Sequence, residues 1–281
     1  MQTKTYYKYA QDVIGGKVVS GKFIQLAAER FFSMMEDDRY EFKEKKADEV
    51  IEFFSILQHF TGRHAGKSFI LQPWQQFVIA AIYGFYIKET GERLVKYVYI
   101  EIARKNGKTA FAAGLSLYHL IADGEMDAEV DLAANSKEQA KIAFKFCSQF
   151  AKGIDPKGKD LVSYRDKVKF EKMLSLLQVF AADDSKLDGF NASMYLIDEY
   201  HAAKNTGLKD VLQSSQGMRD NPMAVIITTA GFDKLGPCYQ YREMCTEVLS
   251  GLKENDALFA AIFSPDEGDD WKDPEIWQKS N

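Results

Sequence analysis

The stretch that decides the fold is Tyr-Val-Tyr-Ile-Glu-Ile-Ala-Arg-Lys-Asn-Gly-Lys-Thr, residues 97–109. Its first half is apolar and rich in β-branched and aromatic residues, which predicts a buried strand over residues 94–103. A polar loop follows and ends in Gly107, Lys108 and Thr109, after which helical spacing begins. A loop between a strand and a helix N-terminus is typical of phosphate binding. Backbone N–H groups face the phosphate, the lysine reaches the β- and γ-phosphates, and the hydroxyl ligates Mg²⁺.

The loop is a variant of the usual pattern G-x-x-x-x-G-K-[ST], because Ile102 stands where the first glycine belongs. A Gly-Lys-Thr tripeptide in a plain surface loop is the alternative, and the flanking strand and helix favour the functional interpretation. Arg104 could stabilise charge that develops on a transferred phosphate, or could simply be a solvated loop charge. The residues predicted to bind ATP here are Lys105, Asn106, Gly107, Lys108 and Thr109.

A second element appears at Met194-Tyr195-Leu196-Ile197-Asp198-Glu199, where an apolar run ends in two acids. This pattern indicates a Walker B strand. Asp198 would hold Mg²⁺ and Glu199 would orient and deprotonate the attacking water. A strand that ends in a solvated acidic turn is common, but the phosphate loop upstream favours catalysis. Together the two elements predict a Mg²⁺-dependent ATP hydrolase.

Further candidates surround these two elements. Thr228 and Thr229 end another apolar strand, and their hydroxyls could sense the γ-phosphate or the lytic water; a plain strand end is the alternative. The amide of Gln75 has both a donor and an acceptor, which suits the edge of adenine, whereas Trp74 is expected to be a core anchor. Arg219 lies just before the Thr228 strand, and it could contact the nucleotide of a neighbouring subunit.

Strands alternate with helices after residue 94, which predicts a mostly parallel sheet flanked by helices, with ligands at the carboxyl ends of its strands. Residues 1–94 look helical and are predicted to form an N-terminal subdomain, residues 95–265 the ATPase core, and residues 266–281 an acidic linker. The predicted strands are 94–103, 128–134, 162–170, 174–181, 192–197, 223–228 and 257–263. The predicted helices are 23–35, 48–60, 74–86, 108–122, 136–152, 206–216 and 237–249.

Composition narrows the class of protein. The chain has 281 residues, of which 46% are hydrophobic, so it can support a globular core. Its formal net charge of −5 is unlike that of most sequence-specific DNA binders, although it permits weak contacts that form and release. The three cysteines are scattered along the chain, which indicates ordinary thiols in a reducing compartment. The apolar run 77–87 is too short to span a bilayer, so no membrane association is expected.

Several segments in order resemble the large terminase subunit of tailed bacteriophages, the ATPase of the DNA-packaging motor. The resemblance implies a RecA-like P-loop core with an N-terminal helical subdomain and a loop that tolerates Ile102. It also implies adenine near Gln75, with Gln72 a less certain helper, and coupling of hydrolysis to movement through Thr228 and Thr229. The segments are Asp12–Lys17, Leu71–Gln75, Arg104–Thr109, Leu187–Asn191, Ile197–Glu199, Thr228–Gly231 and Asp266–Trp271.

The resemblance further implies ATP and Mg²⁺ as cofactors and translocation of double-stranded DNA into a procapsid. Its partners would be a portal protein, a small terminase subunit and further copies in a homo-oligomeric ring, although the isolated domain could be a monomer. The expected location is the cytoplasm of the infected bacterial host. Large terminases usually continue into a nuclease domain, of which residues 1–281 show no sign. Nuclease activity is therefore not expected in this chain, which we expect to be a fragment.

Two other functions use the same core. A helicase-like DNA remodeller would need a second RecA-like domain or a strand-separating element, for which the chain has no room. A nucleotide-binding scaffold that docks onto other motor proteins would hydrolyse little ATP. The presence of Glu199 argues against the scaffold, because nucleotide binding alone needs no general base.

Overall fold

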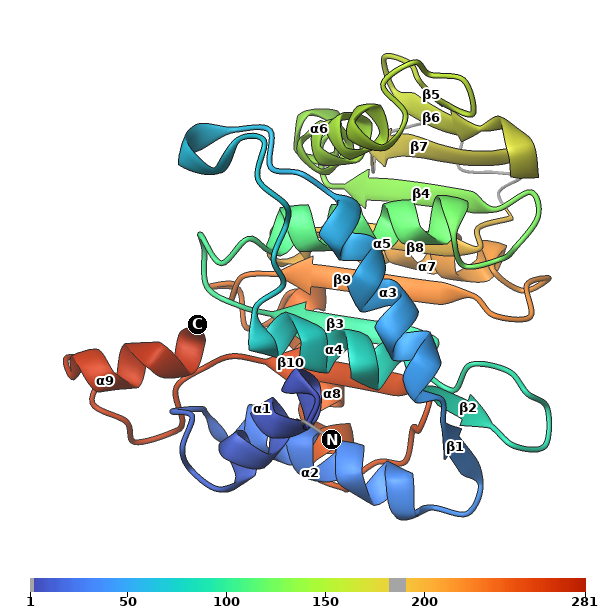
Figure 1. Cartoon of the computed structure of the whole chain (residues 1–281). Coiled ribbons are helices and arrows are strands. Elements are labelled where there is room, and N and C mark those ends of the chain that lie inside the picture. The colour runs from blue at the N-terminus through green and yellow to red at the C-terminus, as the bar shows by residue number, and fades with distance from the viewer. Residues whose placement is uncertain (1–2, 182–190) are drawn as a thin grey trace.

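An eight-stranded sheet runs through the middle of the computed structural model, which describes residues 3–181 and 191–281 (Figure 1). The first six strands of the sheet are parallel and the last two are antiparallel, as the alternation of strands and helices predicted. In spatial order the strands are β10 (Leu258–Ile262), β3 (Tyr97–Glu101), β9 (Met223–Thr228), β8 (Met194–Asp198), β4 (Glu129–Ala134), β7 (Ser175–Ala181), β6 (Lys167–Phe170) and β5 (Leu161–Ser163).

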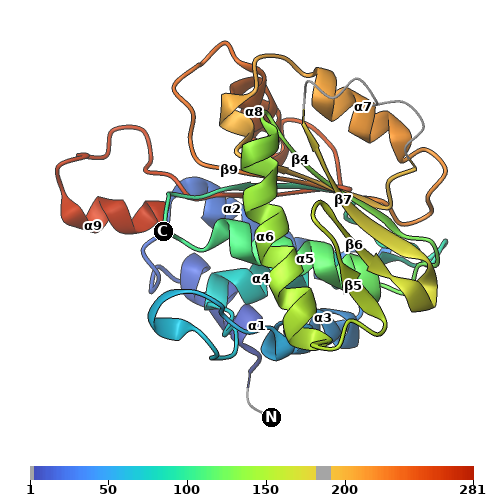
Figure 2. The same ribbon diagram turned by 90° about the horizontal axis from the view of Figure 1, so that it is seen from above.

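The central strands read as unbroken apolar runs because helices cover both faces of the sheet. Every residue of β8, β9 and β10 is buried. Figure 2 shows α7 and α8 on one face and the other long helices that cover the sheet on the opposite face. These opposite helices are α3 (Glu44–Ile56), α4 (Pro73–Tyr83), α5 (Lys108–Ile121) and α6 (Lys137–Ile154), facing α7 (Gly207–Ser215) and α8 (Pro237–Leu249).

Two of the helix starts follow directly from their sequence. Pro73 is the first residue of α4, where its missing N–H costs no hydrogen bond. Ser136 caps α6, and its hydroxyl accepts a hydrogen bond from the N–H of Gln139 at 3.3 Å. Both helices therefore begin within one residue of the predicted starts at 74 and 136.

The N-terminal helices α1 (Thr5–Ile14) and α2 (Lys22–Glu36) share one hydrophobic core with the sheet. The ring of Phe77 on α4 lies 5.5 Å from Phe31 on α2 and 6.1 Å from Phe259 on β10. Trp74 is buried and its ring lies 5.3 Å from that of Phe263, as expected of a core anchor. The boundary at residue 94 stays a prediction, and the two parts on either side of it pack through a continuous apolar interior.

Three details differ from the sequence prediction. Residues 162–170 are two strands, not one, because a turn separates β5 from β6 and Ser163 pairs with Val168. Helix α3 ends at Ile56, short of residue 60, since Leu57 is extended with ψ 145°. Helix α4 ends at Tyr83, short of residue 86, with Gly84 as its C-cap. The chain then forms β2 (Phe85–Ile87), which pairs antiparallel with β1 (Tyr40–Phe42).

The C-terminal arm, residues 264–281, folds back towards the loop that follows β3. It contains the short helix α9 (Pro274–Trp277) and a single 3-10 turn, η4 (Gln278–Ser280) (Figure 1). Lys279 Nζ lies 2.8 Å from carboxylate oxygens of both Asp266 and Asp269, which closes the arm on itself. The carbonyl of Ser280 accepts the N–H of Ala103 at 3.1 Å. The predicted role of this segment as a linker stays a prediction.

Among the helices of the described ranges, none combines the length and the apolar character needed to cross a membrane.

Close packing of α3 on α5 should depend on Gly114. A Cβ at Gly114 would overlap the ring of Phe54, so we expect Gly114→Ala to lower the free energy of unfolding by about 1–3 kcal/mol. Gly153 on α6 is the matched control, since a Cβ there meets no atom within 4 Å. Gly153→Ala should be neutral or stabilising by up to about 1 kcal/mol. Urea unfolding of both variants measures the difference, and equal stabilities would contradict this packing.

Candidate functional site

The loop between β3 and α5 forms an open concavity of backbone N–H groups at the carboxyl edge of the sheet. Gly107 and Lys105 both have left-handed backbone conformations, with φ of 73° and 72°. Glycine adopts this conformation without strain, whereas Lys105 is strained, as residues at functional sites often are. The N–H groups of Lys105, Asn106 and Gly107 donate to no residue in the described part of the chain. With the N-terminus of the 14-residue helix α5, they form a cradle suited to phosphate.

Lys108 and Glu199, predicted from separate motifs, meet in a largely buried ion pair. Lys108 is the first residue of α5 and only 7% exposed, and its Nζ lies 2.7 Å from Oε1 of Glu199. Glu199 directly follows β8 and has a left-handed φ of 57°. The two strands that lead to these residues, β3 and β8, are separated by β9 in the sheet. The end of β9 therefore lies between the two motifs.

Asp198 and Thr109 form the neighbouring pair. The hydroxyl of Thr109 donates to Oδ2 of Asp198 at 3.0 Å. Burial, with a smaller contribution from the charge of Glu199, raises the pKa of Asp198 to about 6, against the opposing effect of Lys108 and Thr109. Its second oxygen, Oδ1, is buried and makes no hydrogen bond with the described residues. A hydroxyl beside a carboxylate with an unused oxygen is the ligand chemistry that Mg²⁺ prefers.

Strand β9 delivers Thr228 and Thr229 to the same edge, where both contact His201. The hydroxyl of Thr228 accepts the backbone N–H of His201 at 3.0 Å and lies 3.1 Å from its Nδ1. The hydroxyl of Thr229 lies 3.3 Å from the same nitrogen. His201 is therefore part of the site, although the sequence analysis did not select it. Its position two residues after Glu199, on the turn η3 (Tyr200–Ala202), was the available signal.

Gln75 lies beneath a cavity and does not line it. Its side chain is 3% exposed, and its Oε1 accepts the N–H of Gln72 at 2.9 Å, which caps the start of α4. A cavity of about 820 Å³ opens between the N-terminal helices and the phosphate loop, and Gln72 lines it. This volume suits a small-molecule ligand. The other lining residues include Tyr9, Pro73, Trp74, Lys105 and Asn106.

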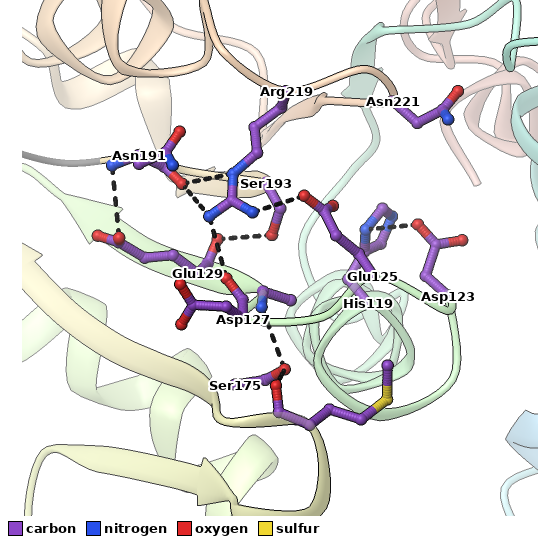
Figure 3. Close-up of polar contacts among 12 residues, drawn as sticks. His119, Asp123, Glu125, Asp127, Glu129, Ser175, Asn191, Ser193, Arg219 and Asn221 are labelled. Atoms are coloured by element: carbon purple, nitrogen blue, oxygen red, sulfur yellow. Dashed lines mark hydrogen bonds and ion pairs between the residues drawn. The ribbon is translucent and has the colours of Figure 1, made fainter.

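The two candidate arginines have opposite environments. Arg104 is exposed and makes no ion pair or hydrogen bond with the described residues. Arg219 lies at the amino ends of the strands, away from the phosphate loop, and its guanidinium is held by its own chain (Figure 3). It donates to Oε1 of Glu125 at 2.6 Å and to the carbonyls of Asp127 and Asn191. Within the chain the Arg219 guanidinium is thus engaged, and its contact with a neighbouring subunit's nucleotide stays a prediction.

One predicted segment cannot be placed. Residues 187–190, which contributed to the resemblance noted in the sequence, lie outside the described residues. Asn191 is described, and its carbonyl accepts from Arg219.

The chain is similar to known proteins in sequence and in fold. Residues 73–247 match the family model of the terminase large subunit, ATPase domain. The large terminase subunit of Enterobacteria phage HK97 is 26% identical over 191 residues, which are 64% of this chain and 35% of that protein. The protein YmfN of Escherichia coli (strain K12) is 40% identical over 94 residues, which are 34% of this chain and 21% of that protein. The chain thus spans about a third or less of these relatives' length.

The crystal structure of the HK97 large terminase has the same fold. It superposes with a TM-score of 0.69 at 21% sequence identity, covering 84% of this chain and 47% of that one. The likeness confirms the predicted RecA-like class, with a mostly parallel sheet flanked by helices.

Burial of Asp198 should make stability depend on pH. Because its pKa is higher in the folded chain than the unfolded value of 3.8, ionisation of Asp198 destabilises the fold as pH rises from about 4 to 6. In the absence of Mg²⁺, we expect Asp198→Asn to be more stable than wild type by about 1–3 kcal/mol at pH 8 and equal to it below pH 4. Urea unfolding across this range measures the difference. The exposed Asp166→Asn is the control, and a pH-independent gain for Asp198→Asn would contradict the assignment.

Proposed function

Since the chain belongs to the family of terminase large-subunit ATPase domains, we propose that it hydrolyses ATP to drive double-stranded DNA through a packaging motor. The observation that carries this proposal is the convergence of Lys108, Thr109, Asp198 and Glu199 at one sheet edge. Two motifs far apart in the chain supply a phosphate cradle, a cation site and a carboxylate base within hydrogen-bond distance of one another. A module that only bound nucleotide would need no such base.

ATP would lie across the phosphate loop with its nucleoside in the adjacent cavity. The N–H groups of Lys105, Asn106 and Gly107, which donate to no described residue, would bind the phosphates, and Lys108 would reach their far end. Gln72 lines the cavity and can contact adenine, whereas Gln75 holds the backbone of Gln72 in place. The predicted adenine role therefore passes to Gln72, with Gln75 as its support.

Thr109 and Asp198 would hold Mg²⁺, which supplies charge neutralisation at the phosphates when it is bound. The unpaired Oδ1 of Asp198 supports this assignment, because a buried carboxylate oxygen without a partner is costly. Glu199 would accept the proton of the attacking water. Thr228 and Thr229 end the strand between the two motifs, a position suited to couple the reaction to movement of β9.

The remaining assignments of the motor follow from the family. We propose that residues 1–94 form a helical subdomain, residues 95–265 the ATPase core, and residues 266–281 a linker. The partners would be double-stranded DNA, a portal protein, a small terminase subunit and further copies of this chain in a ring, in the cytoplasm of an infected bacterium. The net charge of −5 suits DNA contacts that form and release in each cycle.

Hydrolysis should depend on Glu199 and Lys108 in different ways. We expect Glu199→Gln to bind ATP normally and to lose turnover by at least about a hundredfold, because the general base is gone. Lys108→Ala should weaken both ATP binding and turnover. Mg²⁺-dependent phosphate release, measured with and without double-stranded DNA, tests both variants. Glu243→Gln, which is exposed on α8, is the control. Undiminished turnover in Glu199→Gln would refute the assignment of the base.

Substitution of Arg104 should affect catalysis, whereas substitution of Arg219 should affect stability. If Arg104 stabilises charge on the γ-phosphate, Arg104→Ala should lower kcat by about a thousandfold. It should leave unfolding unchanged, because Arg104 makes no hydrogen bond or ion pair with the described residues. Arg219→Ala should lower the free energy of unfolding by about 3 kcal/mol, because it leaves Glu125 and two carbonyls without their donor. Turnover and urea unfolding of both variants test the division, which an unstable Arg104→Ala would contradict.

A further inference from the structure

The two carboxylate oxygens of Glu199 face different partners. Oε1 is held by Lys108 Nζ at 2.7 Å. Oε2 is buried and makes no hydrogen bond, yet it lies 3.1 Å from Nδ1 of His201, at an angle short of hydrogen-bond alignment. The first partner also faces the predicted phosphate position, so nucleotide and Glu199 compete for it. The second partner does not face the predicted phosphate position, and its other neighbours are the hydroxyls of Thr228 and Thr229.

His201 connects this carboxylate to the end of β9. Its Nδ1 lies within 3.3 Å of both the Thr228 and the Thr229 hydroxyls, and its backbone N–H donates to Thr228. One ring nitrogen is thus shared among a carboxylate and two hydroxyls. A small rotation of the ring or of the carboxylate changes which of them is bonded.

The loop that follows β9 packs directly on His201. A Cβ at Gly231 would lie 3.1 Å from the Cβ of His201, so the backbone there is in close contact with the residue. Beyond Gly231 the loop carries Phe232, which is fully exposed, and Leu235, which is 86% exposed. A change in the position of His201 therefore reaches a surface segment within a few residues.

We propose that His201 is a positioning residue. When nucleotide draws Lys108 away, His201 becomes the hydrogen-bond partner that holds Glu199, and the change in its hydrogen bonds shifts the loop of residues 230–236. The proposal rests on the proposed ATPase function. With Lys108 on the phosphates, Oε1 of Glu199 is free to meet water, while His201 fixes Oε2. The bond that His201 then makes to Glu199 is one that it no longer makes to Thr228 or Thr229. The hydrogen bonding of Glu199 is thereby coupled to the hydrogen bonding of Thr228 and Thr229 at the end of β9.

A pair of substitutions separates this role from a packing role. His201→Leu keeps the volume and removes the nitrogen, whereas His201→Asn places an amide nitrogen near the position of Nδ1. We expect His201→Leu to lower kcat about 10- to 100-fold, because the base is misplaced, with KM for ATP within about twofold of wild type. His201→Asn should recover most of the kcat. Both variants keep the backbone bond to Thr228, and urea unfolding measures any general loss of stability.

The second measurement follows the loop itself. Phe232→Cys can be labelled selectively with bimane, because the native Cys147, Cys238 and Cys245 are buried. We expect the emission of the label to shift on addition of Mg²⁺ and ATPγS. The shift should be absent in the His201→Leu background and present in His201→Asn.

The outcomes distinguish this proposal from the function on which it rests. Unchanged kcat in His201→Leu, or a label shift that persists there, overturns the role of His201 while leaving the ATPase intact. Loss of kcat without recovery by Asn overturns it as well. If the wild-type chain binds ATPγS but does not hydrolyse ATP, kcat gives no comparison. The presence or absence of the label shift in the His201→Leu background then decides whether His201 has this role. Failure to bind nucleotide would overturn the proposed function, and with it any role for His201.

Discussion

The buried ion pair between Lys108 and Glu199 is the interaction around which the candidate site is arranged. A buried charge is tolerated only with a partner, so the start of α5 and the end of β8 must stay together. The parallel sheet provides this proximity, because β3 and β8 end at the same edge with β9 between them. Burial raises the pKa of the neighbouring Asp198 and makes its ionisation unfavourable, and the charge of Glu199 adds to this effect. The charges of the site are therefore only partly balanced by the described residues, and a bound cation and phosphates would balance them further.

Most of the fold and the centre of the site could be predicted from local sequence. Apolar runs with turns between them located the strands, and two motifs located Lys108, Thr109, Asp198 and Glu199. The features that local sequence did not show have a common cause, which is that they depend on contacts between distant segments. Nothing near His201 in the chain shows that Thr228 will approach it. Gln72 and Gln75 are equally polar, and only the packed helix determines which one faces the cavity. The hydrogen bonds from Arg219 to Glu125 and Asn191 likewise join segments that are far apart in the chain.

The two edges of the sheet have different roles, because the candidate site lies at one edge and structural hydrogen bonds dominate the other. At the carboxyl edge, strained residues such as Lys105 and Glu199 surround groups that lack partners. At the amino edge, Arg219 joins three chain segments by hydrogen bonds that its own chain satisfies (Figure 3). Asp127 and Leu174 are also left-handed there, so backbone strain alone does not mark the reactive edge. What distinguishes the carboxyl edge is that two adjacent carboxylates, Asp198 and Glu199, each have a buried oxygen with no hydrogen-bond partner among the described residues and lie beside Thr109 and Lys108.

The C-terminal arm has a consequence for affinity. It returns from β10 to the phosphate loop, where Ser280 accepts the N–H of Ala103 and Asn281 accepts the side-chain amide of Asn106. Asp266 at the root of the arm accepts the N–H of Lys22 at the start of α2, so the loop is braced from a distant helix. A loop fixed in this way loses its conformational entropy when the chain folds, not when a ligand arrives. More of each phosphate contact is then available as binding free energy.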